Sequence, residues 1–207
     1  RTARYASPQL VIQEIKHLVN RYGVKEIKIY DDLFTAHRTR LQEIADLMQA
    51  EGLDKEVHIE CTNRANLTTR ELLEDCRRLG ITALAFGFES GSQRVLEILK
   101  TDSVDVAQNR RAIQMCRDMG MEVRGSFIIG TPGETGADLA ETYRFLEDNK
   151  LDALKICVLT PLPGTPIWMD AEKAGKVSRN MAWKKLHFSD FSRTWRDHII
   201  LNDTRTR

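Results

Sequence analysis

The sequence predicts an α/β protein whose five parallel strands form part of a barrel. Helical patterns that end on glycine are each followed at once by an apolar strand, and the unit recurs at intervals of roughly 30 residues, the length of a βαβ step. Strands that alternate with helices favour a parallel sheet with right-handed crossovers. Several strands carry polar residues on one face, which indicates a sheet that lines a cavity rather than one covered on both faces.

Each helix is predicted from its end signals. The first begins after Ser7, a favourable N-cap, and ends at Gly23. Thr68 and Glu71 form a predicted capping box for a helix that ends at Gly80. The other predicted helix ends are Gly52, Gly120 and Asn149. The interval between Gly80 and Gly120 is longer than the others and contains a further helix-like stretch at 93–100.

Strands are predicted directly after these helix ends, at 26–30, 57–61, 83–88, 123–129 and 153–159. In the second strand Ile59 and Cys61 lie on one face and Glu60 on the other, and the fourth sets Arg124 opposite Phe127. A polar strand face implies a cavity for a polar ligand. Five strands cannot close an eight-stranded barrel, so we expect a partial barrel that lacks at least one upstream strand.

Composition excludes several classes of partner. The chain is 42% hydrophobic and 29% charged, with a net charge of +1, which leaves no basic excess for a nucleic-acid backbone. No apolar run is long enough for a membrane, and no signal peptide is readable. The four cysteines are too scattered for a disulfide framework or a zinc ribbon, and Cys61 and Cys157 fall on strands as buried structural thiols. We therefore expect a cytoplasmic chain with no metal ligand of its own.

A short polar motif follows every predicted strand, at the C-terminal strand end where α/β proteins bind ligands. Carboxylates, arginines and glycine turns gathered at one edge suit a zwitterion joined to a polyol, such as an amino acid attached to a nucleoside. The motifs are Asp31-Asp32, Thr62-Asn63-Arg64, Glu89-Ser90-Gly91, the Gly-Thr-Pro-Gly-Glu of 130–134 and the Pro-Leu-Pro-Gly of 161–164.

Four longer segments around these motifs resemble, in their order and spacing, the core of radical S-adenosylmethionine (radical SAM) enzymes. The segments are IKIYDDLFT, FGFESGSQRVLEILK, GSFIIGTPGET and LTPLPGTP. The likeness is greatest to the branch that often carries an upstream cobalamin-binding domain. It covers residues 1–170, and we take 171–207 as a C-terminal extension that leads to a variable region.

The resemblance implies a partial TIM-like (β/α)6 barrel whose first strand and loop hold a CxxxCxxC motif. Three thiolates there bind a 4Fe–4S cluster, and the enzyme reductively cleaves S-adenosylmethionine to a 5′-deoxyadenosyl radical for hydrogen abstraction. Cobalamin-dependent methyl transfer is one outcome that it implies. This sequence has no CxxxCxxC motif and begins at Arg1, so we expect a truncated core that is inactive on its own, with the cluster ligands outside this chain.

The resemblance also assigns residues to the methionine end of the cofactor. Asp31 and Asp32 stand where the family receives the methionine ammonium, although either could cap the following helix. Arg64 would pair with the methionine carboxylate, with an interior salt bridge to Glu60 as the alternative. No catalytic residue is assigned.

The adenosine end is assigned in the same way. Glu89, with Ser90 beside it, would take the ribose hydroxyls, unless Glu89 caps the next helix. The contacts implied on the fourth strand and its turn are Arg124, Ser126, Ile128 and Gly130. A structural ion pair is the alternative for Arg124, and core packing is the alternative for Ile128.

The expected partners of the parent enzyme are a small-molecule or cofactor-type substrate and an electron donor such as flavodoxin or ferredoxin. Two other readings stay open. One is a non-radical barrel enzyme that uses Lys28, His58 and Glu60 as acid–base groups. The other is a non-catalytic nucleoside-binding module built on the same barrel.

Overall fold

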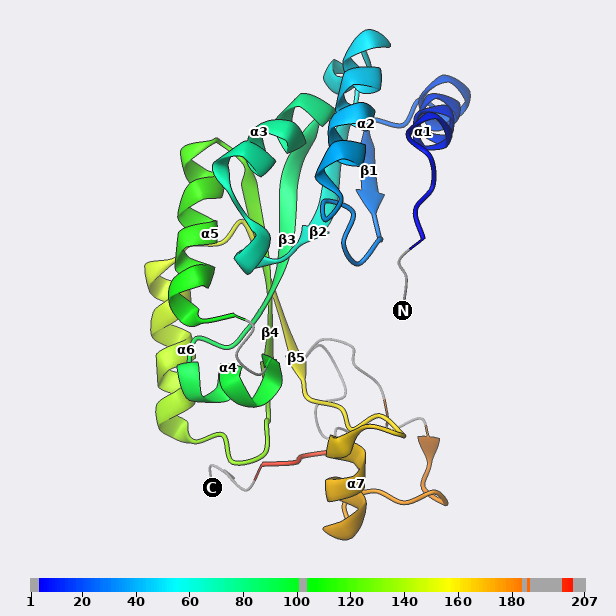
Figure 1. Cartoon of the computed structure of the whole chain (residues 1–207). Coiled ribbons are helices and arrows are strands. Elements are labelled where there is room, and N and C mark those ends of the chain that lie inside the picture. Colours follow the sequence, from blue (N-terminus) through cyan, green and yellow to red (C-terminus); the bar gives the residue numbers. More distant parts are fainter. Residues whose placement is uncertain (1–3, 101–103, 184–185, 187–198, 203–207) are drawn as a thin grey trace. The chain divides into compact units, whose positions relative to one another are not determined.

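The computed structural model describes residues 4–100, 104–183, 186 and 199–202 of the chain (Figure 1). The chain divides into two compact units, Arg1–Gly87 with Ala107–Arg124, and Phe88–Val106 with Gly125–Arg207. Strands and helices alternate along the chain, which confirms the predicted α/β class.

The first unit holds α1 (Pro8–Tyr22), β1 (Glu26–Ile29), α2 (Arg38–Ala50), β2 (His58–Asn63), α3 (Arg70–Leu79) and two short 3₁₀ helices, η1 (Leu53–Lys55) and η2 (Ala65–Leu67). It also holds most of β3 (Ile81–Glu89), nearly all of α5 (Val106–Asp118) and the start of β4 (Glu122–Ile129). The second unit holds the ends of β3 and β4 with α4 (Gln93–Lys100), α6 (Gly136–Asp148), β5 (Ala153–Val158) and α7 (Pro166–Lys173).

The strands form one sheet in the order β1-β2-β3-β4-β5. The β1–β2 and β2–β3 pairs are parallel, with Ile29 beside Cys61 and Cys61 beside Leu84. Each strand overlaps its predicted range. In the first unit α2 packs against α1 and α3 (Figure 1), and the buried core includes Met48 and Leu73 from these helices.

Both predicted ends of α1 are confirmed, and the cap predicted for the start of α3 is wrong. Ser7 Oγ accepts a hydrogen bond from the Leu10 N–H, and Gly23 ends α1 in the left-handed conformation. The predicted capping box at Thr68 does not form, because the N-cap of α3 is Thr69. The Thr68 hydroxyl is buried instead, where it accepts from Asn63 and donates to the Arg64 carbonyl.

The predicted alternation of strand faces is confirmed within each unit. Along β2, Ile59 and Cys61 are buried, whereas Glu60 is half-buried and His58 exposed. Along β4, buried residues alternate with the half-buried Arg124, Ser126 and Ile128. On each of these strands the polar residues therefore lie on the face that the local core does not cover.

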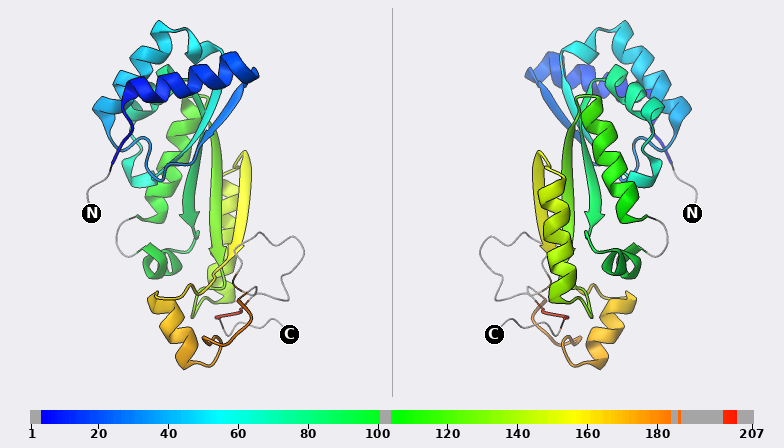
Figure 2. Two further views of the ribbon diagram at one scale, coloured as in Figure 1. Left: turned by 90° about the vertical axis from the view of Figure 1, so that its right-hand side faces the viewer. Right: turned by 90° about the vertical axis from the view of Figure 1, so that its left-hand side faces the viewer.

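Aromatic packing forms the core of the second unit, where α6 runs beside β4 and β5 (Figure 2). The rings of Phe88, Phe127 and Phe145 lie with centroids 5.9 to 6.1 Å apart. A separate cluster surrounds Trp168 of α7, whose ring stacks on Trp183. In the described part of the chain, no helix combines the length and apolar character that a membrane crossing requires.

Candidate functional site

The end of β3 is held in an unusual backbone conformation. Glu89 has a φ of 62°, and among the described residues it is the non-glycine residue with positive φ. An L side chain in this region costs of order 1–3 kcal/mol, a strain that clusters at functional sites. The Glu89 carboxylate lies 3.1 Å from the Lys100 Nζ, and its side chain is 16% exposed. Glu89 thus presents an acidic group at the strand end that solvent can still reach.

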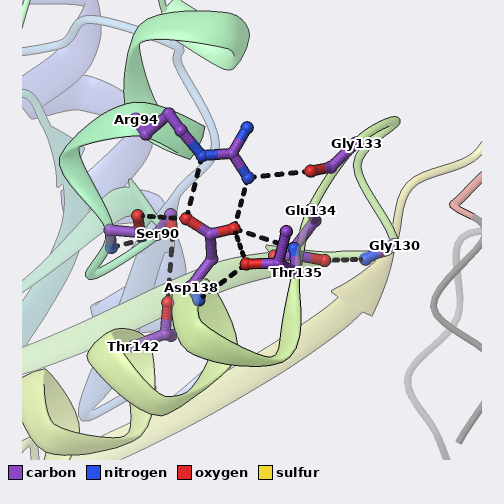
Figure 3. Close-up of polar contacts among 9 residues, drawn as sticks. Ser90, Arg94, Gly130, Gly133, Glu134, Thr135, Asp138 and Thr142 are labelled. Carbon is purple, nitrogen blue, oxygen red and sulfur yellow. Dashed lines mark hydrogen bonds and ion pairs between the residues drawn. The ribbon is translucent and has the colours of Figure 1, made fainter.

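The segment after Glu89 is fastened to one face of α6 (Figure 3). The Ser90 hydroxyl lies 3.1 Å from the Thr142 hydroxyl, and the Gly91 N–H donates to the same Thr142 oxygen at 3.0 Å. Ser92 Oγ donates to Asp138 at 2.8 Å. Ser90 is fully buried, so its predicted cofactor contact stays a prediction, and its observed partners are protein groups.

Gly91 permits this close approach because it has no side chain. A Cβ at this position would lie 2.5 Å from Phe145 Cβ and 2.7 Å from the Thr142 Cα. Both distances are far below van der Waals contact, and the second involves backbone that cannot turn aside. The glycine is therefore required for the segment to lie against α6.

The loop after β4 folds around the buried carboxylate of Glu134. The Gly130 N–H donates to Glu134 Oε2 at 2.6 Å, and the Glu134 N–H donates to the Thr131 carbonyl at 2.9 Å. Burial raises the pKa of Glu134, while backbone hydrogen bonds from Gly130 and Thr131 act in the opposite direction. Gly130, predicted as a cofactor contact, therefore has its N–H directed to Glu134.

Asp138 joins this loop to the segment after β3 (Figure 3). It forms a capping box with Thr135, whose N–H and hydroxyl donate to Asp138 Oδ2 at 2.8 and 2.6 Å. Arg94 forms an ion pair with the same carboxylate and donates to the Gly133 carbonyl at 2.8 Å. The Arg94 guanidinium, followed by the Thr135 and Ser92 hydrogen bonds, lowers the pKa of Asp138, although burial opposes this.

In the first unit the predicted acidic pair is exposed. Asp31 and Asp32 follow β1 and line a cavity of about 500 Å³ together with Tyr5 and Tyr30. Within the described parts of the chain neither carboxylate has a hydrogen bond or ion pair. Arg64 is half-buried, and its carbonyl accepts from the Thr68 hydroxyl. The roles of these three residues in cofactor binding stay predictions.

Ion pairs occupy the polar face of the first unit. Glu60 lies 2.6 Å from both Lys28 Nζ and Arg124 Nη1, and Arg124 also pairs with Glu122 at 3.1 Å. Hydrogen bonding to Glu122 and the charges of its acidic neighbours raise the pKa of Arg124. Arg124 thus makes the structural ion pair that the sequence left open, and Glu60 pairs with it and Lys28 rather than Arg64. A cofactor contact by Arg124 stays a prediction.

This cluster borders a cavity of about 600 Å³ whose lining includes His58. Lys28 and Glu60, two members of the alternative acid–base site, pair with each other. Ser126 and Ile128 lie half-buried on the polar face of β4, as expected, and their cofactor contacts are untested.

Sequence reasoning missed the residues that hold the strand-end segments of the second unit together. Their one recognisable signal is the Thr135-x-x-Asp138 capping box, while the partners on α4 and α6 became visible only in three dimensions. These residues are Arg94, Glu134, Thr135, Asp138 and Thr142.

The cysteines do not form a metal centre. All four are free, and Cys61, Cys76 and Cys116 are buried. Burial raises the pKa of both Cys61 and Cys116 to about 12 and also raises that of Cys76. Among the described residues no group of three or more Cys, His, Asp or Glu side chains could hold a metal ion.

Comparison with known proteins decides the family. The model of the Radical SAM superfamily matches residues 1–146. The chain belongs to the radical SAM superfamily. The family predicted from the four strand-end segments is therefore confirmed.

Sequence relatives of this radical SAM chain are longer proteins. It is 32% identical to an uncharacterised methyltransferase of Pyrococcus horikoshii over 86% of this chain and 38% of that protein. It is 31% identical to an anaerobic magnesium-protoporphyrin IX monomethyl ester cyclase of Cereibacter sphaeroides over 82% of this chain and 28% of that protein. The chain thus spans well under half the length of these relatives.

Two solved structures share the fold of this chain. The methyltransferase TsrM of Kitasatospora setae, solved with cobalamin and a [4Fe–4S] cluster, has a TM-score of 0.71 at 16% identity, over 83% of this chain and 34% of that one. The archaeal Elp3 of Methanocaldococcus infernus has a TM-score of 0.60 at 18% identity, over 82% and 47%. The predicted partial TIM-like barrel fold is confirmed.

The residues of this chain fit one family cofactor and not the other. Glu89 offers carboxyl oxygens as hydrogen-bond acceptors at a strand end, the chemistry that ribose hydroxyls require. Cysteines that are buried on separate elements do not fit a [4Fe–4S] cluster, which needs several thiolates held together. We derive no step through a cluster from the groups of this chain.

Proposed function

We propose that this chain is the S-adenosylmethionine-binding core of a radical SAM enzyme that cleaves S-adenosylmethionine reductively. The observation that carries the proposal is Glu89, an acidic residue in a strained conformation at the end of β3, in a chain of this family. The 4Fe–4S ligands would come from outside these 207 residues, because the sequence contains no CxxxCxxC motif.

When bound, S-adenosylmethionine and a reduced cluster supply the radical chemistry, and the residues of this chain bind and orient the cofactor. Glu89 accepts hydrogen bonds from the ribose hydroxyls, and the Lys100 Nζ, 3.1 Å away, holds its carboxylate in place. Ile128 and the backbone of the Gly130–Gly133 turn contact the adenine. Glu134, buried beneath that turn, keeps the Gly130 N–H oriented.

For the first unit the proposal assigns Asp31 and Asp32 to the methionine ammonium and Arg64 to its carboxylate. The exposure of both aspartates supports it, because a ligand can reach them. Arg124 and Ser126 remain proposed cofactor contacts on the polar face of β4. We assign residues 1–170 to the core and 171–207 to an extension.

The whole protein is proposed to use cobalamin for methyl transfer, since the solved structures of similar fold include the cobalamin-bound TsrM and the methylating relative of P. horikoshii is similar in sequence. A small-molecule substrate, flavodoxin or ferredoxin as electron donor, and a reducing cytoplasmic compartment complete the proposal. Four free cysteines are consistent with that compartment.

Binding of adenosine to the 207-residue chain tests the proposal, with S-adenosylmethionine as second probe and calorimetry as readout. Glu89→Gln removes the charge but keeps the size, and we expect about tenfold to hundredfold weaker adenosine binding. Glu141→Gln, at an exposed position on α6, is the matched control and should bind like the unaltered chain.

Two results would contradict the proposal. One is that the unaltered chain binds neither probe, and the other is that Glu89→Gln binds adenosine as tightly as the control. We also expect the chain with dithionite and S-adenosylmethionine to form no 5′-deoxyadenosine, because it lacks the cluster ligands.

A further inference from the structure

We propose that Arg94 and Asp138 are positioning residues that set the spacing between the ribose-binding end of β3 and the adenine-binding turn after β4. The inference rests on the proposed function, since it concerns the adenosine end of the same site. Neither residue would touch the cofactor. Each acts by fixing the two segments that do.

Helix α6 holds the segment that follows β3. Asp138 and Thr142 are four residues apart, so they lie on one face of the helix, one turn from each other. Thr142 accepts from the Gly91 N–H, and Asp138 accepts from the Ser92 hydroxyl. Two successive residues after the Glu89–Ser90 strand end are thereby attached to a single rigid element.

The Asp138 carboxylate also holds the turn after β4. Asp138 Oδ2 accepts the N–H and hydroxyl of Thr135, which directly follows the turn. Asp138 is 5% exposed, and both of its oxygens are used, one toward Ser92 and the other toward Thr135. The carboxylate therefore connects the two segments rather than serving either alone.

Arg94 closes the connection from the α4 side. Its Nε faces Asp138 Oδ1 at 3.2 Å, its Nη2 pairs with Oδ2, and the same Nη2 donates to the Gly133 carbonyl at 2.8 Å. A planar guanidinium can make these contacts together, whereas a lysine ammonium is a single point of charge. The geometry of the fork, rather than its charge alone, fixes the turn relative to α4.

Amide hydrogen exchange on the ligand-free chain tests the connection directly. In Arg94→Met we expect about tenfold faster exchange at the Gly130 and Gly91 N–H groups, because both segments lose a common anchor. Arg94→Lys should exchange almost as fast as Arg94→Met, because it keeps the charge but loses the fork. Arg144→Met, on the exposed face of α6, is the matched control and should leave both amides unchanged.

Adenosine binding supplies the functional readout. We expect Arg94→Met and Asp138→Asn to bind adenosine about tenfold more weakly than Arg144→Met, with methionine binding unchanged. Loss of affinity for adenosine alone separates positioning from general unfolding, which would weaken both ligands.

Each outcome decides the inference. Unchanged exchange at Gly130 and Gly91 in Arg94→Met would overturn it, whatever the binding data. Full recovery of slow exchange in Arg94→Lys would also overturn it, since charge alone would then suffice. If the unaltered chain binds no adenosine, the proposed function fails, while the exchange data still decide whether Arg94 and Asp138 fix the two segments.

Discussion

The strand ends of the two units differ in how firmly they are held. After β3 and β4, in the second unit, side chains from α4 and α6 fasten each segment through hydrogen bonds that are buried or partly buried (Figure 3). After β1, in the first unit, Asp31 and Asp32 are exposed, and no described residue binds their carboxylates. The segments proposed for adenosine are thus pre-organised, and the acidic pair proposed for methionine is not.

This difference predicts which strand ends contribute more to the free energy of ligand binding. Groups held before a ligand arrives pay less ordering entropy on binding, so pre-organised segments give most of the affinity. An exposed acidic pair contributes little until a partner group fixes it. The chain by itself should therefore recognise the nucleoside better than the amino acid.

Cysteine reactivity should separate the units most strongly. A pKa of about 12 instead of the ordinary 9.0 lowers the thiolate fraction of Cys61 or Cys116 about a thousandfold at pH 8. Only the half-buried Cys157, in the second unit, should react with iodoacetamide in the native chain, and all four should react in denaturant. Intact mass with peptide mapping gives the count, and rapid native alkylation of Cys61 would contradict the buried core.

Among these substitutions Gly91→Ala should cause the largest loss of stability. The loss should arise in the second unit, where residue 91 lies against α6. The added Cβ meets the backbone of Thr142, and forced overpacking of this kind costs about 3 kcal/mol. Gly136→Ala is the control, because nothing lies within 4 Å and alanine is favoured in a helix, by up to about 1 kcal/mol. Urea unfolding measures both, and equal stability of the two variants would show that the segment does not lie against α6.

Asp138→Asn should lower the free energy of unfolding by about 2 kcal/mol at pH 7, since the charged acceptor of several hydrogen bonds is lost. The folded-state pKa of Asp138 lies below its unfolded value, so its contribution is present above about pH 4 and is lost as pH falls toward the folded pKa. The difference in the free energy of unfolding between the unaltered chain and Asp138→Asn should become smaller as pH falls below 4. A difference that stays constant would show that ionisation of Asp138 is irrelevant.

Asp31→Asn and Asp32→Asn should have the smallest effects. Exposed carboxylates without partners contribute within about 0.5 kcal/mol to stability. Adenosine binding should also stay within about twofold of the unaltered chain. A loss of adenosine affinity as large as that expected for Glu89→Gln would remove the distinction between the two strand ends.

Local signals in the sequence were sufficient for the elements and the family. Glycines at helix ends, apolar alternation and the polar motif after each strand are short-range features. The helix end at Gly23, the burial of Ile59 and the acidic end of β3 could therefore all be predicted. The capping box failed because Thr68 and Thr69 are both good N-caps, and only the tertiary contact with Asn63 selects between them.

Beyond the capping box of Thr135 and Asp138, the network around Asp138 could not be predicted, because its other members come from α4 and from the segments that follow β3 and β4. Arg94 reads as an ordinary exposed helix residue, and nothing in its neighbours shows that it meets Asp138 and the Gly133 carbonyl. The partner of Glu60 was ambiguous for the same reason. Arg64 and Arg124 were both candidates from polar positions of the sequence, and in the structure Glu60 pairs with Arg124.

Amide chemical-shift mapping with adenosine tests the central claim most directly. We expect adenosine to move the backbone resonances of Glu89, Gly91 and Gly130 in the second unit and to leave those of Lys28 and Glu60 unchanged. Shifts confined to Lys28, His58 and Glu60 would contradict the account and favour an acid–base site on the polar face of the first unit.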